Sequence, residues 1–291
     1  MKPTRSGRTR ALTCALVVTM TSSLAAAGPP AEGAVQAEGA VRAEAAVHAG
    51  PVAALERQMR GHDGVRVTSV SRAFFQADGF RVTARWREVG EFGGGEVAAK
   101  DITYPRGNSA GVKRSIIFTD RSYALHRKRP GYVPEGKPWV LDVRKNDLYL
   151  ECGKIRLSDP ATLRRVLATT TSKRPAGVYD GARTTLHEGS VTVGELYELN
   201  PTLWVDVFEK PTGRYASYAE LPVRWRLWIG RDQLVRRCQT RYDEPAALGN
   251  DRERSFMTDD VRFSGWGDAI DIEPPPGDEV STRDEFVFSD D

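Results

Sequence analysis

The chain of 291 residues carries 42 lysines and arginines against 39 aspartates and glutamates, a formal net charge of +3, and 40% of its residues are hydrophobic. This balance is typical of a soluble globular protein and excludes a chain built mainly from membrane-spanning segments. The charge is uneven, because residues 51–267 carry a net of +9 and residues 268–291 a net of −8. The basic body suits an anionic surface, such as phospholipid headgroups or wall polymers, or is neutralised by the acidic tail.

The first residues have the parts of a secretory signal peptide. Four basic residues precede a mostly apolar stretch over 11–24, and Ala25-Ala26-Ala27 supplies the small residues that signal peptidase requires. We therefore predict a signal peptide over residues 1–27 and a secreted, extracytoplasmic protein. A retained membrane anchor is the alternative, but the apolar run is shorter than the roughly 20 residues that span a bilayer.

Residues 28–50 form a low-complexity linker. A six-residue unit rich in Ala and Glu occurs there three times, at 31–36, 37–42 and 43–48. Such units have too little bulk to bury the core of a β-solenoid, so a flexible or transiently helical spacer is predicted. Residues 51–288 then form one domain with an acidic C-terminal tail, because no second linker interrupts them.

The domain is expected to open with a short helix over Ala53–Arg60, followed by strands. From Phe80 to Arg87, apolar or small residues alternate with polar ones, as in a strand with one face on a core and the other in water. Glycine-containing turns then lead to strands over Val97–Tyr104 and Val112–Asp120. Short strands joined by such turns predict an antiparallel meander.

The main helix is predicted to begin at Asp159-Pro160. An aspartate at the N-cap accepts a hydrogen bond from a free amide, and a proline at the first helical position has no amide to leave unpaired. Leu163, Val166 and Leu167 then form an apolar stripe at helical spacing. We expect this helix to cover the concave face of the sheet.

The last quarter of the chain predicts a hairpin and a further strand. Alternate residues from Val223 to Ile229 are apolar and are followed by a Gly-Arg-Asp-Gln turn. Val261 and Phe263 then share one face of a strand. That strand reaches a Trp-Gly corner and stops before three prolines, which cannot donate hydrogen bonds to a ladder.

One pattern suggests catalysis. Gly107-Asn108-Ser109-Ala110-Gly111 fits the nucleophile elbow G-x-S-x-G, with His126 and His187 as hypothetical bases. An elbow needs a strand before it and a helix after it, whereas strand patterns flank these residues on both sides. A hairpin turn explains the same residues, and we predict that the protein has no catalytic residue and is not an enzyme.

The sequence predicts neither a metal site nor a cofactor. The four histidines are far apart, and none has a His or Cys partner at the spacing of a zinc site. The basic run His126–Arg129 is either a solvated loop or a loop that touches an anionic membrane surface. Tryptophan and arginine alternate over 224–228, as they also would in a strand with one wet face, and no nucleic acid is expected as a partner.

The order of several segments resembles that of a known family. They are Trp139-Val140, Gly181–Leu196, the hairpin at Leu221–Arg237 and the strand at Val261–Pro275. Together they resemble the actinobacterial LppX/LprAFG-type envelope lipoproteins, which have the LolA/LolB-like fold. The resemblance implies an α+β fold in which a curved antiparallel sheet, a half-barrel, wraps over a few helices. It also implies that Gly181–Leu196 forms a central pair of strands.

The chain departs from this family at its leader. Members usually carry a lipidated cysteine at the signal cleavage site, whereas Cys14 lies inside the apolar run. Lipidation is therefore not expected, and the protein would be secreted without an anchor.

The resemblance implies binding rather than catalysis. We expect a secreted carrier of lipid or lipoprotein in the cell envelope that holds an apolar chain between the sheet and the helices. The alternative is an envelope sensor or regulatory domain that contacts an anti-sigma factor or another protein without bound lipid. The residues expected to line the cavity are Trp86, Ile116, Phe118, Trp139, Leu163, Leu167, Trp225 and Leu227.

Cys152 and Cys238 are the cysteines that remain once the leader is removed. In an oxidising compartment, an even pair is more often bonded than free. We therefore predict a disulfide between the connection that precedes the Asp159 helix and the second strand of the C-terminal hairpin. The alternative is two small buried side chains too far apart to bond.

Overall fold

The computed structural model describes residues 50–75, 81–108, 111–126, 134–201, 218–244 and 255–282. All of them lie in a compact unit that runs from Val41 to Asp291. The leader, most of the linker and the end of the acidic tail lie outside the described residues. So do Ser109 of the elbow pattern and Arg127–Arg129 of the basic run.

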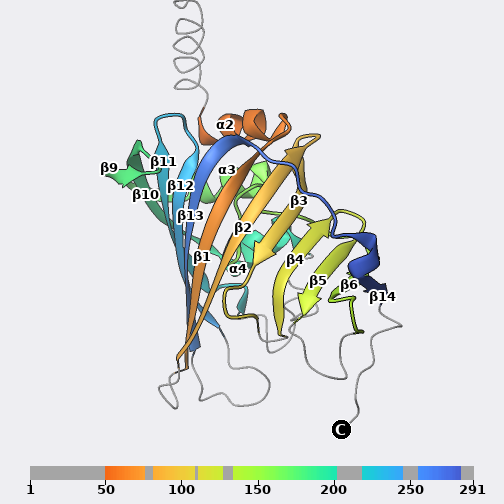
Figure 1. The fold of residues 1–291 in the computed structure, drawn as a ribbon. Coiled ribbons are helices and arrows are strands. Elements are labelled where there is room, and N and C mark those ends of the chain that lie inside the picture. Colours follow the sequence, from red (N-terminus) through yellow and green to blue (C-terminus); the bar gives the residue numbers. More distant parts are fainter. Residues whose placement is uncertain are drawn as a thin grey trace, which may run out of the picture. The chain divides into compact units, whose positions relative to one another are not determined.

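Most of the described residues belong to one open, curved sheet of twelve strands (Figure 1). Its order is β14-β6-β5-β4-β3-β2-β1-β13-β12-β11-β10-β9, and β14 pairs parallel with β6, whereas the other neighbours pair antiparallel. The predicted α+β class with a curved, mostly antiparallel sheet is confirmed. The strands are β1 (Asp63–Phe75), β2 (Arg81–Gly93), β3 (Glu96–Thr103), β4 (Val112–Phe118), β5 (Ser122–His126), β6 (Trp139–Asp142), β9 (Thr170–Tyr179), β10 (Ala182–Thr192), β11 (Pro222–Gly230), β12 (Val235–Glu244), β13 (Ser255–Ala269) and β14 (Val280–Thr282).

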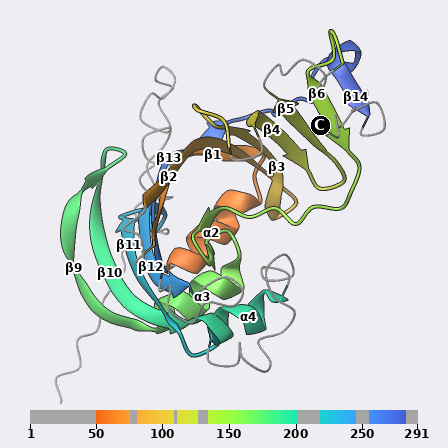
Figure 2. The same cartoon turned by 90° about the horizontal axis from the view of Figure 1, so that it is seen from below.

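Three α-helices of the described chain lie on the concave side of the sheet (Figure 2): α2 (Pro51–Met59), α3 (Pro160–Ala168) and α4 (Val193–Leu199). Their buried side chains share one hydrophobic core with those of the strands. We call the side of the sheet that faces this core the inner face and the opposite side the outer face. No helix in the described part of the chain is long and apolar enough to cross a membrane.

Helix α3 begins where the sequence predicts. The Asp159 carboxylate accepts hydrogen bonds from the backbone amides of Ala161 at 3.2 Å and Thr162 at 3.0 Å. Leu163 and Val166 are buried, and Leu167 packs against the core. The N-cap and the apolar stripe therefore act together to dock this helix on the sheet.

Replacing the N-cap of α3 has a predictable cost. Asp159→Ala leaves two amides without their acceptor, so we expect the free energy of unfolding to fall by about 1 kcal/mol in urea denaturation. Asp159→Asn keeps an acceptor oxygen and serves as the control, with a smaller loss. Equal losses in both variants would mean that the carboxylate does not act as a cap.

The prediction of a pair of strands over Gly181–Leu196 is wrong, because the structure has one strand there and then a helix. Ala182–Thr192 forms the single strand β10, and the chain then turns directly into helix α4. Thr192 and Glu195 form a reciprocal capping box: the Thr192 hydroxyl accepts from the Glu195 amide at 3.2 Å, and the Glu195 carboxylate accepts from the Thr192 amide at 2.8 Å. The spacing Thr-x-x-Glu is the sequence signal that was missed.

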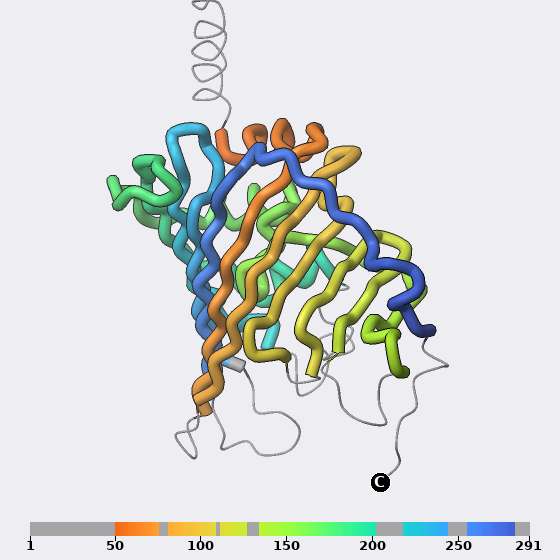
Figure 3. The backbone as a smooth tube through the Cα atoms, viewed as in Figure 1, coloured from red at the N-terminus to blue at the C-terminus, as the bar shows by residue number. Residues whose placement is uncertain are grey.

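The C-terminal hairpin is confirmed as β11 and β12, but the following strand is longer than predicted. The Trp-Gly corner lies inside β13, where Gly265 and Gly267 have φ of +61° and +88° opposite a register shift in β1. A positive φ is readily adopted only by glycine, so these residues allow a bulge within the strand. Residues 270–276, which we call the strap, then cross the outer face and lead to β14 beside β6 (Figures 1 and 3).

Candidate functional site

The eight residues expected to line one cavity are divided between the two faces of the sheet. Leu163, Trp225 and Leu227 are buried in the core beneath the helices, and Leu167 packs against them. Trp86 lies on the inner face of β2, half-buried, two residues from Glu88. The strand register places the remaining three, Ile116, Phe118 and Trp139, on the outer face.

The described side chains pack closely beneath helices α2 and α3. A cavity in this part of the core measures about 10 Å³, and Leu55, Leu150, Leu163 and Phe263 are among its lining residues. A cavity of this size has room for about one water molecule. This cavity is too small for an acyl chain.

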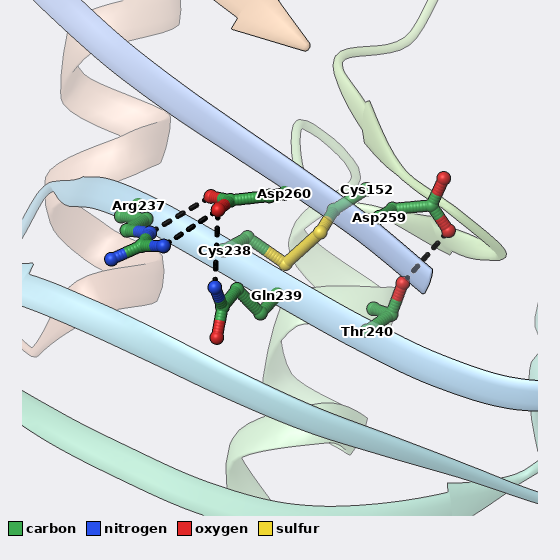
Figure 4. Close-up of a disulfide and its surroundings, with 7 residues drawn as sticks. All are labelled: Cys152, Arg237, Cys238, Gln239, Thr240, Asp259 and Asp260. Atoms are coloured by element: carbon green, nitrogen blue, oxygen red, sulfur yellow. Dashed lines mark hydrogen bonds and ion pairs between the residues drawn. A yellow bond between two sulfur atoms is a disulfide. The ribbon is translucent and has the colours of Figure 1, made fainter. Parts of the chain in front are cut away.

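A short hairpin helps to fill this interior. It consists of β7 (Glu151–Cys152) and β8 (Ile155–Arg156), and the predicted Cys152–Cys238 disulfide ties it to β12 (Figure 4). The two Cα atoms are 6.2 Å apart, within the usual range for a disulfide. The disulfide is thus confirmed, and it joins the hairpin to the inner face of the sheet.

The turn of this hairpin fits closely against the sheet. Gly153 has a φ of +57°, and a Cβ atom at this position would collide with the Asp259 carboxylate and lie 2.6 Å from the Thr240 hydroxyl. Those two side chains hydrogen-bond to each other at 3.0 Å beside the disulfide (Figure 4). Glycine is therefore required here by both the backbone angle and the available space.

A buried ion pair lies on the inner face, where the sequence predicted an apolar lining. Lys100 Nζ lies 2.9 Å from Glu88 Oε1, and both side chains are almost fully buried. Lys100 also donates a hydrogen bond to the carbonyl of Tyr149 at 2.8 Å. The signal for this pair was available, because Glu88 falls on the same strand face as Trp86 and Phe92 and must point toward the interior.

The ionisation of Lys100 depends on this partner. Burial by itself lowers the pKa of the lysine, but the negative charges of Glu88 and Glu151 outweigh that effect and raise the pKa above its ordinary value of 10.5. The lysine is therefore charged at neutral pH. Arg156 of β8 extends the polar interior, with a hydrogen bond of 3.2 Å to Asn200, which donates to Thr162 of α3 at 2.7 Å.

A second part of the inner face carries an open hollow. It lies on strands β4–β6 and has a volume of about 330 Å³. These strands stand away from the helices (Figure 2). Ile117, Ala124 and Val140 are among its lining residues. So are Asp142 and Arg144, which form an ion pair at 3.3 Å. His126 also lines the hollow, and burial lowers the pKa of its imidazole, so the ring is uncharged at neutral pH. Its apolar side chains, together with a few polar groups, form a lining that could take a ligand.

Two of the residues expected in the interior line a groove on the outer face instead. Ile116 and Trp139 lie beneath the strap, in a groove of about 670 Å³. Arg114 stacks on the Trp139 ring at 5.8 Å and binds Asp101 through two hydrogen bonds, of 2.9 and 2.7 Å. The lining of this groove is therefore more polar than the lining of the hollow on the inner face.

The elbow pattern lies in a hairpin connection. Residues 104–111 lie between β3 and β4 in the chain, and the Asn108 amide donates to the Val112 carbonyl at 2.9 Å. A strand follows where a nucleophile elbow needs a helix, which supports the hairpin interpretation. Within the ranges that the structure describes, no three His, Cys, Asp or Glu side chains are grouped to hold a metal ion.

Comparison with known proteins gives similarity to solved structures alone. No protein-family model matches the chain, and no curated protein matches it in sequence. LprF from Mycobacterium bovis is 14% identical, with 81% of this chain and 98% of that chain covered and a TM-score of 0.38. A LolA superfamily protein from Nitrosomonas europaea is 10% identical, with 79% and 94% covered and a TM-score of 0.26. A DUF1329 family protein from Desulfovibrio piger is 12% identical, with 76% and 91% covered and a TM-score of 0.28.

These identities and TM-scores assign the chain to no family. LprF and the LolA superfamily protein belong by name to the groups that the sequence resembles. Membership in the envelope lipoprotein family stays a prediction, as does ligand contact by the eight residues named from the sequence.

Proposed function

We propose that this protein is a secreted, non-enzymatic binding protein of the cell envelope that carries a lipid or an acylated molecule. The observation that supports the proposal is the open hollow on the inner face of β4–β6, which is lined by Ile117, Ala124 and Val140. Its volume of about 330 Å³ falls at the lower end of the usual range for ligand pockets. The apolar chain would lie there and not in the cavity beneath α2 and α3, which measures about 10 Å³.

The disulfide supports an extracytoplasmic location. Structural disulfides persist in secreted and envelope proteins and are rare in the cytosol. The Cys152–Cys238 bond therefore agrees with export directed by the signal sequence at residues 1–27.

A second candidate is a sensor or regulatory domain that contacts an anti-sigma factor or another protein without bound lipid. The filled interior supports it, because the disulfide-tied hairpin and the Glu88–Lys100 ion pair occupy the space that a carrier would leave open. Native mass spectrometry of the secreted protein separates the two candidates. Co-purified lipid supports the carrier, and its absence supports the regulatory domain.

A substitution in the hollow tests the carrier directly. We expect Ala124→Trp to place an indole ring where the chain would lie and to weaken binding of a fluorescent long-chain fatty acid. Displacing two buried methylene groups costs about 1.6 kcal/mol, which corresponds to a roughly tenfold higher Kd. Fluorescence titration of the secreted protein measures this change.

Ala161→Trp is the matched control. Ala161 is exposed on α3, so the same change in size there leaves fatty acid binding as in the wild type. Circular dichroism checks that both variants fold. A wild-type protein that binds no fatty acid, or two variants that bind it equally well, would refute binding in this hollow.

A further inference from the structure

The outer face carries a groove that the proposed function does not use. It lies across β10–β13 and β1, on the opposite side of the sheet from the hollow, and has a volume of about 630 Å³. Arginine side chains and hydroxyl groups from neighbouring strands line it. The four arginines are Arg72, Arg224, Arg226 and Arg241. The arginines of the groove outnumber its three carboxylates, which are Glu188, Asp259 and Asp260.

The strand register brings three of these arginines into one row. Arg224 of β11 pairs with Ser190 of β10 on one side and with Arg241 of β12 on the other. Arg241 in turn pairs with Thr258 of β13, and Thr258 pairs with Arg72 of β1. Neighbouring strands are about 4.8 Å apart, so the row places guanidinium and hydroxyl groups next to each other across five strands.

Three carboxylates line the groove, and each already has a partner. Asp259 accepts a hydrogen bond from the Thr240 hydroxyl at 3.0 Å. Glu188 lies 2.8 Å from Arg226 and 3.5 Å from Arg174. Asp260 accepts two hydrogen bonds from Arg237, at 2.8 and 2.6 Å, and these bonds help to lower the pKa of Asp260 against the opposing effect of burial.

Among the described residues, the three arginines of the row have no carboxylate partner. Among the described residues, Arg72 and Arg224 form no ion pair, and Arg241 lies over the Phe256 ring at 4.4 Å. Arg224 and Arg241 also stand directly opposite each other on adjacent strands. Like charges in this position destabilise a sheet, so an anion between them would relieve the repulsion.

We propose that this groove is a binding site for a phosphoryl anion. Planar guanidinium groups bind phosphate oxygens through paired, charge-assisted hydrogen bonds. The hydroxyls of Ser190 and Thr258 stand in the same row and can donate to the remaining oxygens. The same chemistry is present in the headgroup of an anionic phospholipid and in a free phosphate compound.

The first experiment uses inorganic phosphate and the secreted protein at constant ionic strength. Phosphate is expected to raise the Tm of the wild type, because a ligand that binds only the folded state stabilises it. In the double variant Arg224→Gln/Arg241→Gln, the Tm without phosphate is expected to be equal or higher, because the opposed charges are gone. Phosphate should no longer raise it, and calorimetric affinity should fall roughly tenfold for each arginine removed.

Arg85→Gln/Arg87→Gln is the matched control. These two arginines are exposed on the outer face of β2, outside the groove, and their removal changes the net charge by the same amount. Phosphate should raise the Tm of this variant as it does that of the wild type. Equal loss of the phosphate effect in both double variants, or no phosphate effect on the wild type, would overturn the site.

A second experiment identifies the source of the phosphoryl group. Sedimentation with phosphatidylcholine vesicles, with and without phosphatidylglycerol, measures binding to a membrane surface. Binding that requires phosphatidylglycerol and is lost in Arg224→Gln/Arg241→Gln supports a lipid headgroup. Binding of phosphate without binding of vesicles supports a soluble phosphate compound. Because inorganic phosphate has no acyl chain, this test is independent of the hollow on β4–β6.

Discussion

Reducing the Cys152–Cys238 disulfide is expected to lower the free energy of unfolding by about 4 to 5 kcal/mol. The bond closes a loop with a sequence separation of 86 residues, and the chain-entropy relation gives this value for a loop of that length. The bond also holds the β7–β8 hairpin in the interior, so its loss frees the segment that fills the space beneath the helices. Urea denaturation with and without reductant measures the difference.

The variant Cys152→Ala/Cys238→Ala supplies the control. Its stability should be close to that of the reduced wild type and should not respond to reductant. Thiol labelling of the unfolded, unreduced mature protein should find no reactive cysteine. A change of less than about 1 kcal/mol on reduction would contradict the loop-closure account.

Breaking the buried ion pair is expected to have an effect of similar size. Glu88→Leu leaves the Lys100 ammonium in the interior without its counter-charge, and the free energy of unfolding should fall by about 3 to 5 kcal/mol. The double variant Glu88→Leu/Lys100→Met removes both charges and fills the volume with apolar groups. Its stability should lie near that of the wild type or above it, and urea denaturation of the three proteins measures the difference.

An exposed ion pair provides the comparison. Arg66 and Asp268 are 3.1 Å apart, with side chains 57% and 43% exposed, so Arg66→Met should cost less than about 1 kcal/mol. If Glu88→Leu cost no more than Arg66→Met, burial would not be the source of the effect.

The pH dependence gives an independent measure of the same pair. The pKa of Lys100 in the folded protein is raised above 10.5, so its contribution to stability is fully present below the unfolded pKa and is lost as the pH rises through the folded pKa. Tyr104 contributes in the same direction, because burial and Glu88 raise the pKa of its hydroxyl above 10.0. The wild type should therefore lose stability at pH above about 10 more steeply than the double variant.

Local features of the fold were predictable from short-range chemistry. The N-cap at Asp159 and the C-terminal hairpin depend on residues close in sequence, so their signals are complete within a few positions. The disulfide was predictable for a different reason, because removal of the predicted leader leaves two cysteines, which allow one intramolecular bond. The single strand at Ala182–Thr192 followed by a helix was also encoded locally, in the capping box of Thr192 and Glu195.

The sequence determined which residues share a face of each strand, and the tertiary structure decided what covers that face. Period-two alternation places Ile116 and Ile117 of β4 on opposite faces of the sheet. It cannot show that the strap, more than 150 residues further along the chain, covers Ile116 on the outer face. The same limit applies to the interior, where the disulfide ties the hairpin of Cys152 to the inner face of β12. The strap and the disulfide-tied hairpin join segments far apart in sequence, so only packing of the whole sheet could determine their positions.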